Sequence, residues 1–206
     1  MATLDTVRWL RAFAASIDEN TEALTELDAA IGDADHGTNM RRGTVAVVAA
    51  FDESAPASAA EALKQAGMVL IRSVGGASGP LYGTLLLRMA TSVGENGLDA
   101  PGFAKALRAG LDGVIARGKA EPGDKTMIDA LTPAVDALEE KLAAGEDFAA
   151  SLAAATEAAE SGRDATIPLQ ARKGRASYLG DRSIGHQDPG ATSTALLISA
   201  ARQALS

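Results

Sequence analysis

Apolar residues recur three and four positions apart from one end of this chain to the other, and Gly, Pro, Asp or Ser stands at the interruptions. This spacing places apolar side chains on one face of a helix, so it predicts a series of amphipathic α-helices. The interruptions divide the series into helices over residues 4–18, 21–30, 39–51, 58–73, 80–92, 101–117, 127–143, 147–164 and 190–204. Short helices with short connections favour an antiparallel bundle.

The composition supports an all-α fold. Aromatic residues make up 3 % of the chain, alanine and leucine dominate, and β-branched residues are scattered rather than clustered. These preferences favour helix over strand. A length of 206 residues is enough for one buried core, and no change of composition marks a boundary. We therefore expect a single domain over residues 1–206.

The charge and the lack of cysteine exclude several classes of function. The chain has 19 basic and 27 acidic residues, and its net charge of −8 argues against binding nucleic acid or anionic membranes. It has no cysteine, which excludes disulfides and thiolate metal sites. No apolar run approaches the ~20 residues of a membrane span, and the N-terminus does not resemble a signal peptide. We expect a cytoplasmic protein with neither nucleic acid nor membrane as a partner.

Three carboxylates stand close together at Asp28, Asp33 and Asp35. Asp28 falls near the C-terminal end of a predicted helix, where the helix dipole already disfavours negative charge. A bound cation would remove this conflict, and carboxylate oxygens suit Mg²⁺, which often completes its shell with phosphate oxygens. The alternative is that Asp33 and Asp35 only form a turn and that Asp28 is a solvated charge. His36, one of two histidines, could contact phosphate, accept a phosphoryl group or satisfy a backbone group.

Two glycine-containing segments precede predicted helices. In "VGGASGPLYG", from Val74, the first amides of the following helix could bind phosphate, although Gly75, Gly76 and Gly79 could equally serve close helix packing.

The second segment, "GKAEPGDKTM", begins at Gly118 and resembles a P-loop, but an aspartate stands directly before Lys125 and a helix precedes it, so we exclude a P-loop. Thr126 and Asp129 have the spacing of a capping box. Met127 could face a ring such as adenine, or it could belong to the core.

A long connection over residues 165–188 has no helical or strand period and is basic at Arg172, Lys173, Arg175 and Arg182. Connections of this length are usually lids, binding loops or disordered segments. Carboxylates for a metal, helix starts for phosphates and an arginine-bearing loop together favour nucleotide-dependent phosphoryl transfer.

Four segments carry a family resemblance: "LDAAIGDADHGTNM", "GGASGPLYG", "RGKAEPGDKTM" and "ARKGRASYLGDRSIGHQDPGATS". They resemble, in the same order, the ADP-binding L subunits of bacterial dihydroxyacetone kinases that depend on the phosphotransferase system. The resemblance implies a barrel of eight up-and-down antiparallel helices with the nucleotide in the loops at one end. One of the nine predicted helices would then be a turn or part of a split helix.

The resemblance also implies roles for individual residues. Asp28, Asp33 and Asp35 would hold two Mg²⁺ ions between the phosphates of ADP or ATP. Arg175 would be the catalytic residue, because a guanidinium can neutralise charge on a moving phosphoryl group. Position 34 is alanine where many relatives have glycine. The nucleotide would be contacted by His36, Gly37, Thr38, Asn39, Ala77, Ser78, Gly118, Met127, Arg175, Asp188, Pro189 and Gly190.

The family has two branches, and the length of this chain resembles the branch that has separate subunits. In that branch ADP is a resident cofactor that is recharged by a phosphohistidine carrier, the M subunit, and dihydroxyacetone is bound by a K subunit. Two alternatives remain at this point. One is a kinase that uses freely exchanging ATP on another small ketose, and the other is a nucleotide-binding regulator that docks on a transcriptional regulator.

Overall fold

A computed structural model describes residues 3–94 and 97–206, and the regular structure within these ranges is helical. The all-α prediction is confirmed. An isolated β-bridge joins Gly94 and Gly97. The helices are α1 (Thr6–Glu19), α2 (Thr21–Ile31), α3 (His36–Glu53), α4 (Ala59–Ser73), α5 (Ser78–Ser92), α6 (Ala100–Gly118), α7 (Ile128–Ala143), α8 (Phe148–Ala165) and α9 (Pro189–Leu205), with a 3₁₀ segment η1 (Arg175–Ser183).

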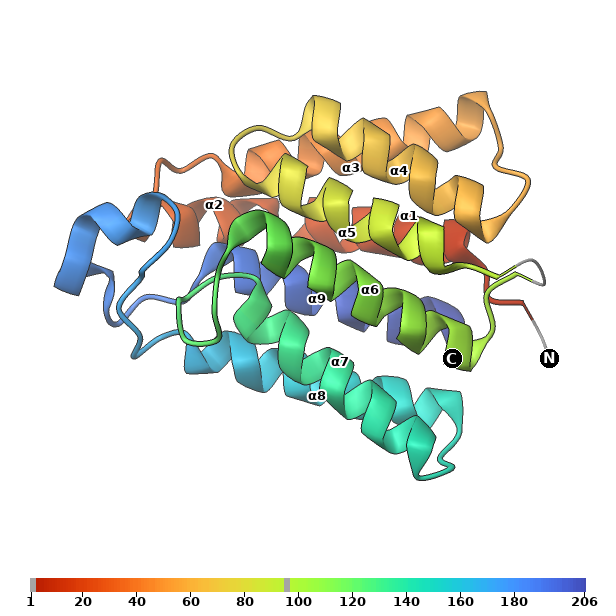
Figure 1. The fold of residues 1–206 in the computed structure, drawn as a ribbon. Helices are drawn as coiled ribbons and strands as arrows, with labels where there is room; N and C mark the ends of the chain where they lie inside the picture. The colour runs from red at the N-terminus through yellow and green to blue at the C-terminus, as the bar shows by residue number, and fades with distance from the viewer. Residues whose placement is uncertain (1–2, 95–96) are drawn as a thin grey trace.

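Eight of these helices pack in a closed order. α1 packs against α3, each of α3 to α8 packs against the next helix along the chain, and α9 packs against both α8 and α1 (Figure 1). The remaining helix, α2, follows α1 after the single residue Asn20 and packs mainly against α3. Nine α-helices are therefore present in the described residues, and α2 is the one outside the closed order.

Most helix bounds lie within two residues of the sequence prediction, and the largest difference is at α3. It begins at His36 rather than at residue 39. The reason is a cap from the preceding helix, because the Asp28 carboxylate accepts hydrogen bonds from the backbone N–H groups of Asp35 and His36. The prediction that residues 165–188 lack regular structure was also wrong in part, since η1 lies within them.

The capping box predicted at the start of α7 is present in part. Asp129 Oδ2 accepts a hydrogen bond from Thr126 N at 2.7 Å, as the motif requires. Thr126 Oγ1 accepts from the N–H of Ile128 at 3.3 Å, one residue earlier than in the standard motif.

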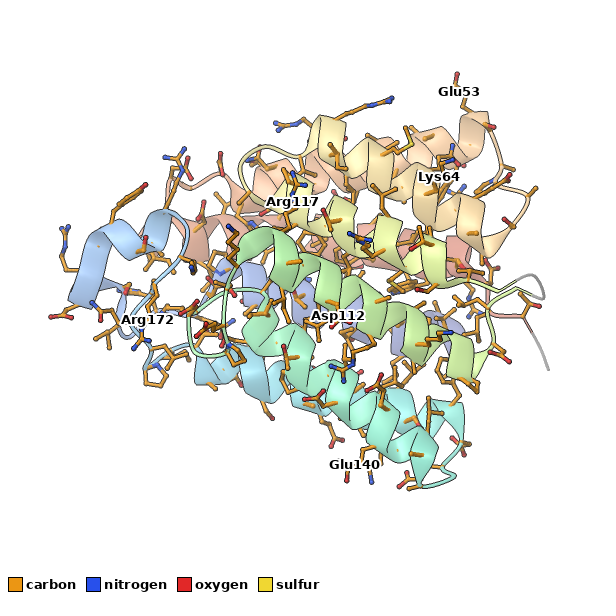
Figure 2. The ribbon with its side chains drawn as sticks, viewed as in Figure 1. Glu53, Lys64, Asp112, Arg117, Glu140 and Arg172 are labelled. Carbon is orange, nitrogen blue, oxygen red and sulfur yellow. The ribbon has the colours of Figure 1, made fainter. Side chains whose placement is uncertain are left out.

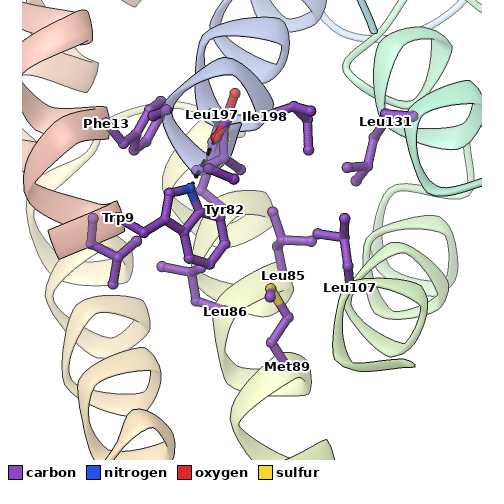
Figure 3. Packing of buried hydrophobic residues seen from close by; sticks show 14 of the residues in the cluster. Trp9, Phe13, Tyr82, Leu85, Leu86, Met89, Leu107, Leu131, Leu197 and Ile198 are labelled. Carbon is purple, nitrogen blue, oxygen red and sulfur yellow. Dashed lines mark hydrogen bonds between the residues drawn. The ribbon is translucent and has the colours of Figure 1, made fainter. Parts of the chain in front are cut away.

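The core lies along the middle of the bundle (Figure 3). Trp9 is fully buried there, donates its indole N–H to the Leu197 carbonyl at 3.0 Å and packs edge-on against Phe103. Exposed charged side chains such as Glu53 and Glu140 cover the outer faces of the helices (Figure 2). None of the described helices is long and apolar enough to cross a membrane.

Both chain ends lie at one end of the bundle, and four connections lie at the other (Figure 1). These connections are α2–α3, α4–α5, α6–α7 and the long α8–α9 connection that contains η1. They include the four segments that the sequence analysis singled out, so the fold brings those segments together at one end.

Candidate functional site

A pocket of about 440 Å³ lies where the four connections meet. Its lining residues lie within the segments 28–39, 75–82, 114–128, 173–176 and 188–190. This volume is within the usual range for sites that bind small ligands. The predicted site residues that line it are Asp28, Asp33, Asp35, His36, Asn39, Ala77, Ser78, Gly118, Met127, Arg175, Asp188, Pro189 and Gly190.

Two of the predicted nucleotide contacts, Gly37 and Thr38, are not among the pocket-lining residues. Gly37 is buried, and a Cβ at this position would overlap the Thr21 carbonyl and Thr25 side chain of α2. Its glycine therefore allows α3 to approach α2 closely. Thr38 is exposed and donates its hydroxyl to the Asp35 carbonyl at 3.0 Å.

The three carboxylates of the α2–α3 connection converge. Each of Asp28, Asp33 and Asp35 can offer one oxygen such that these atoms lie within 4.8 Å of one another. Asp28 is buried, and its Oδ2 accepts from the N–H of Asp35 at 2.8 Å and of His36 at 3.1 Å. A Cβ at Gly32 would overlap this carboxylate. Three converging carboxylates form a donor set of the hard-oxygen type that fits Mg²⁺.

The turn between these carboxylates uses an unusual backbone conformation. Ala34 has φ of 61°, in the left-handed region that favours glycine. The alanine therefore fits the turn, but with some strain.

His36 lies at the start of α3 with both ring nitrogens facing serine hydroxyls. Nε2 lies 2.9 Å from Ser193 Oγ, and Nδ1 lies 3.2 Å from Ser78 Oγ. Burial lowers the pKa of His36, and the nearby charges of Asp28 and Asp35 only partly offset that effect. The imidazole is therefore neutral at neutral pH, and its position is fixed from both sides.

A buried hydroxyl network holds Ser193 in turn. Tyr82 OH lies 2.7 Å from Ser193 Oγ and 3.0 Å from Thr194 Oγ1. Both of these hydroxyls can donate to the Gly190 carbonyl. Sequence analysis missed this support for His36, because Tyr82 belongs to α5 and the hydroxyls belong to α9, more than a hundred positions away.

The glycines of the α4–α5 connection serve two purposes. Gly76 has φ of 65° with open space beside it, so its conformation requires glycine. A Cβ at Gly79 would overlap the Val74 carbonyl, so this glycine serves close packing. α5 then begins at Ser78 without a side-chain cap, so the N–H groups of Ser78 and Gly79 remain available for a ligand, whereas Pro80 has no N–H.

Asp188 is buried at the start of α9, where Pro189 occupies the first turn as the sequence predicted. Its Oδ2 accepts from the N–H of Ala191 at 2.7 Å, and its own N–H donates to Thr166 Oγ1 at 3.0 Å. Burial raises the pKa of Asp188 to about 7, and the hydrogen bond from Ala191 opposes that shift.

Arg175 reaches the carboxylate cluster from the long connection. Its guanidinium lies 3.0 Å from Asp33 Oδ2, while 70 % of its side chain remains exposed. Gly174, just before it, has φ of 65°. Three further cationic residues that the site prediction did not include, Arg117, Lys125 and Lys173, also line the pocket.

Comparisons with known proteins identify the family of this chain. The family model of the DAK2 domain matches residues 30–203. The chain is 47 % identical, over 96 % of its length and 94 % of the relative's, to the ADP-binding subunit DhaL of PEP-dependent dihydroxyacetone kinase 1 from Listeria innocua. It is 48 % identical to the ADP-binding subunit DhaL from Escherichia coli, over 93 % of this chain and 92 % of that one.

Among solved structures, the chain matches the dihydroxyacetone kinase of C. freundii in complex with AMP-PNP and Mg²⁺, with a TM-score of 0.74 and 25 % identity. The match covers 98 % of this chain and 34 % of that kinase, so this chain spans about a third of its length. From the DAK2 match and the near full-length similarity to these subunits, we conclude that the chain belongs to the DAK2 domain family, among the ADP-binding subunits of dihydroxyacetone kinases.

Proposed function

We propose that this chain holds ADP or ATP with Mg²⁺ and passes a phosphoryl group from a phosphohistidine carrier subunit to dihydroxyacetone bound on a K subunit. The observation that carries the proposal is the convergence of three carboxylates, a neutral buried histidine, an uncapped helix start and an arginine on one pocket. The relatives are named as ADP-binding subunits of PEP-dependent dihydroxyacetone kinases, which supports a nucleotide as the ligand of this pocket.

In this proposal Asp28, Asp33 and Asp35 hold the metal ions. Bound Mg²⁺ would neutralise the phosphates and hold them in line for transfer. His36 is held between Ser78 and Ser193, so a neutral imidazole can donate to or accept from a phosphate group without adding charge.

The first-turn N–H groups of α5, beside Ala77 and Ser78, provide further phosphate donors. Gly118 and Met127, on the opposite connection, line the part of the pocket that we assign to adenine.

Arg175 would supply positive charge that neutralises the negative charge on the phosphoryl group during transfer. It enters the pocket from the long connection and already lies next to a carboxylate of the proposed metal site. A guanidinium presents a planar set of donors to phosphate oxygens, which a lysine cannot reproduce. Asp188, Pro189 and Gly190 also line the pocket.

The partner subunits would approach the end of the bundle that carries these connections. Phosphoryl groups must reach and leave the pocket there, because the core fills the rest of the bundle. Arg172 and Arg182 add exposed positive charge to this end, in a chain whose net charge is −8.

A phosphoryl relay tests the proposal. Purified chain is incubated with Mg²⁺, phosphoenolpyruvate carrying ³²P, and the carrier subunit with its upstream phosphotransfer proteins. We expect label on nucleotide held by this chain, and labelled dihydroxyacetone phosphate only after K subunit and dihydroxyacetone are added. Acid-labile label on the polypeptide itself would contradict the proposal. Equal product formation from free ATP without the carrier would instead support a kinase with exchanging nucleotide.

A further inference from the structure

Lys125 is a buried lysine whose ammonium group is surrounded by backbone carbonyls. The residue is 1 % exposed. Its Nζ donates to the carbonyls of Thr166, Leu169, Ser183 and His186 at 2.9, 3.0, 2.7 and 2.5 Å. All four carbonyls belong to the long α8–α9 connection, whereas Lys125 belongs to the α6–α7 connection.

The arrangement resembles a cation-binding cage in which the ammonium takes the place of the ion. An ammonium has three N–H groups, so four carbonyls must share them. Burying a charge is costly unless dipoles or counter-charges replace the lost water. Here the four carbonyl dipoles do so, and Asp188 adds a favourable charge.

The cage closes both ends of a loop. Two of the carbonyls, Thr166 and Leu169, precede η1, and the other two, Ser183 and His186, lie at its end or just after it. The single ammonium therefore ties the two arms of the connection together. Arg175 lies in the part of the loop between these arms, at the start of η1.

Further bonds tie the same two connections together. The N–H of Arg172 donates to the carbonyl of Asp124 at 3.0 Å, and Asp124 directly precedes Lys125 in the chain. Within the loop, Ala171 N donates to Ser183 Oγ at 2.9 Å, and Gly185 N donates to the Ile167 carbonyl at 2.8 Å. The base of the loop is thus fixed, while Arg175 at its tip is largely exposed.

We infer that Lys125 is a positioning residue for the nucleotide site, because its ammonium fixes the loop that places Arg175 and Asp188 at the pocket. The inference rests on the proposed function in that the ligand of the pocket is taken to be Mg–ADP. Removing the ammonium would release both arms of the loop but would leave the packing of the helices in place.

The variant Lys125→Ala, with Lys119→Ala as its control, tests the inference. Lys119 lies in the same connection and also has a left-handed backbone, with φ of 50° against 63° at Lys125, but it is exposed. We expect Lys125→Ala to weaken Mg–ADP binding by about 10- to 100-fold, the loss of affinity that follows when groups that orient the direct ligands are removed. Lys119→Ala should bind as wild type does.

Chemical rescue separates positioning from a general loss of stability. The alanine variant lacks the atoms of n-propylammonium, so adding this ion should restore part of the Mg–ADP affinity. The neutral 1-propanol should not restore it. An unchanged affinity in Lys125→Ala, or equal rescue by 1-propanol, would overturn the inference.

Hydrogen exchange provides a test that does not depend on nucleotide binding. In wild-type protein without ligand, the amides of Ala171, Gly185 and Asp188 should be protected, because each donates within the fixed base of the loop. Lys125→Met removes the ammonium but keeps most of the side-chain volume, so it can be used if the alanine variant fails to fold. In this variant these amides should lose protection, while the amides of α8 keep it. Free exchange in wild type, or full protection in Lys125→Met, would show that the ammonium does not hold the loop. Failure of the phosphoryl relay in wild type would leave this exchange result unaffected.

Discussion

Replacing Asp28 by asparagine should separate its two roles, as a cap of α3 and as a metal ligand. The Asp28 carboxylate accepts two backbone hydrogen bonds, from Asp35 and His36. Hydrogen bonds to charged groups contribute about 1.5–3 kcal/mol and neutral ones about 0.5–1.5 kcal/mol. An isosteric amide therefore loses roughly 2 kcal/mol over the two bonds.

The same change relieves repulsion within the carboxylate cluster. Two unit charges 4.8 Å apart, the limit given by the cluster geometry, repel by about 1 kcal/mol in bulk water and about 3 kcal/mol at an effective dielectric constant near 20. Asp28 faces two such neighbours, Asp33 and Asp35. Over the two neighbours the relieved repulsion is about 2 kcal/mol at the dielectric constant of water and about 7 kcal/mol near 20. The lost capping is about 2 kcal/mol. We therefore expect the free energy of unfolding of the metal-free variant to stay the same or to rise.

Added Mg–ADP should then distinguish the proteins. A ligand at about a thousandfold excess over its dissociation constant stabilises the native state by about 4 kcal/mol. For a chain of this size that raises the Tm by about 8–16 °C. Thermal unfolding with Mg–ADP, and again with excess chelator, should show this shift in wild type and in the exposed control Asp112→Asn. The shift should be largely lost in Asp28→Asn, and a full shift in that variant would refute the metal assignment.

Three further changes have expected outcomes. Arg175→Ala should lower the rate of phosphoryl transfer to the K subunit on the order of 10³-fold, and Arg175→Lys should lower it less. Both variants should keep the helical circular dichroism of wild type. Near-normal transfer by Arg175→Ala would show that this residue is only a surface charge. Ala34→Gly should raise the free energy of unfolding by up to about 1 kcal/mol in chemical denaturation, because φ is 61° there, whereas Ala144→Gly, at φ of −74°, should lower it. Because the pKa of Asp188 is raised to about 7, the folded state holds its proton more tightly than the unfolded state does. Stability from this group is therefore present at about pH 4 and is lost as the pH rises through 7, by about 4 kcal/mol at most. Asp188→Asn, which keeps a capping side chain, should remove that decline in urea titrations across this pH range, and an unchanged decline would contradict the assignment.

The helices could be predicted from the sequence because their signals are local. Apolar spacing, Pro189 after Asp188 and the pairing of Thr126 with Asp129 each act within a few residues. η1 could not be predicted in this way, because residues 175–183 contain few apolar side chains and a non-helical Gly180 interrupts the segment. Its conformation depends on bonds to residues outside it, such as those that Ser183 makes.

The pocket could be predicted in outline, because its segments carry compact groups of charged and glycine residues. Which members face the ligand could not be read from the motif alone. Gly37 and Thr38 stand between His36 and Asn39, yet neither lines the pocket. On a helix, successive residues point about 100° apart, so a motif of four residues cannot face one pocket with all its side chains.

The groups that fix the site were the hardest to infer, because each acts on a different element or connection from its own. Asp28 sets the start of α3 from the end of α2, Tyr82 holds Ser193 from another helix, and Lys125 binds carbonyls 41 to 61 positions away. Lys125 also illustrates how a local motif can mislead. Its place in "GDKTM" suggests a lysine for phosphate, but its ammonium is fully occupied by backbone carbonyls. The guanidinium that contacts the carboxylate cluster instead belongs to Arg175, on the loop that this lysine holds.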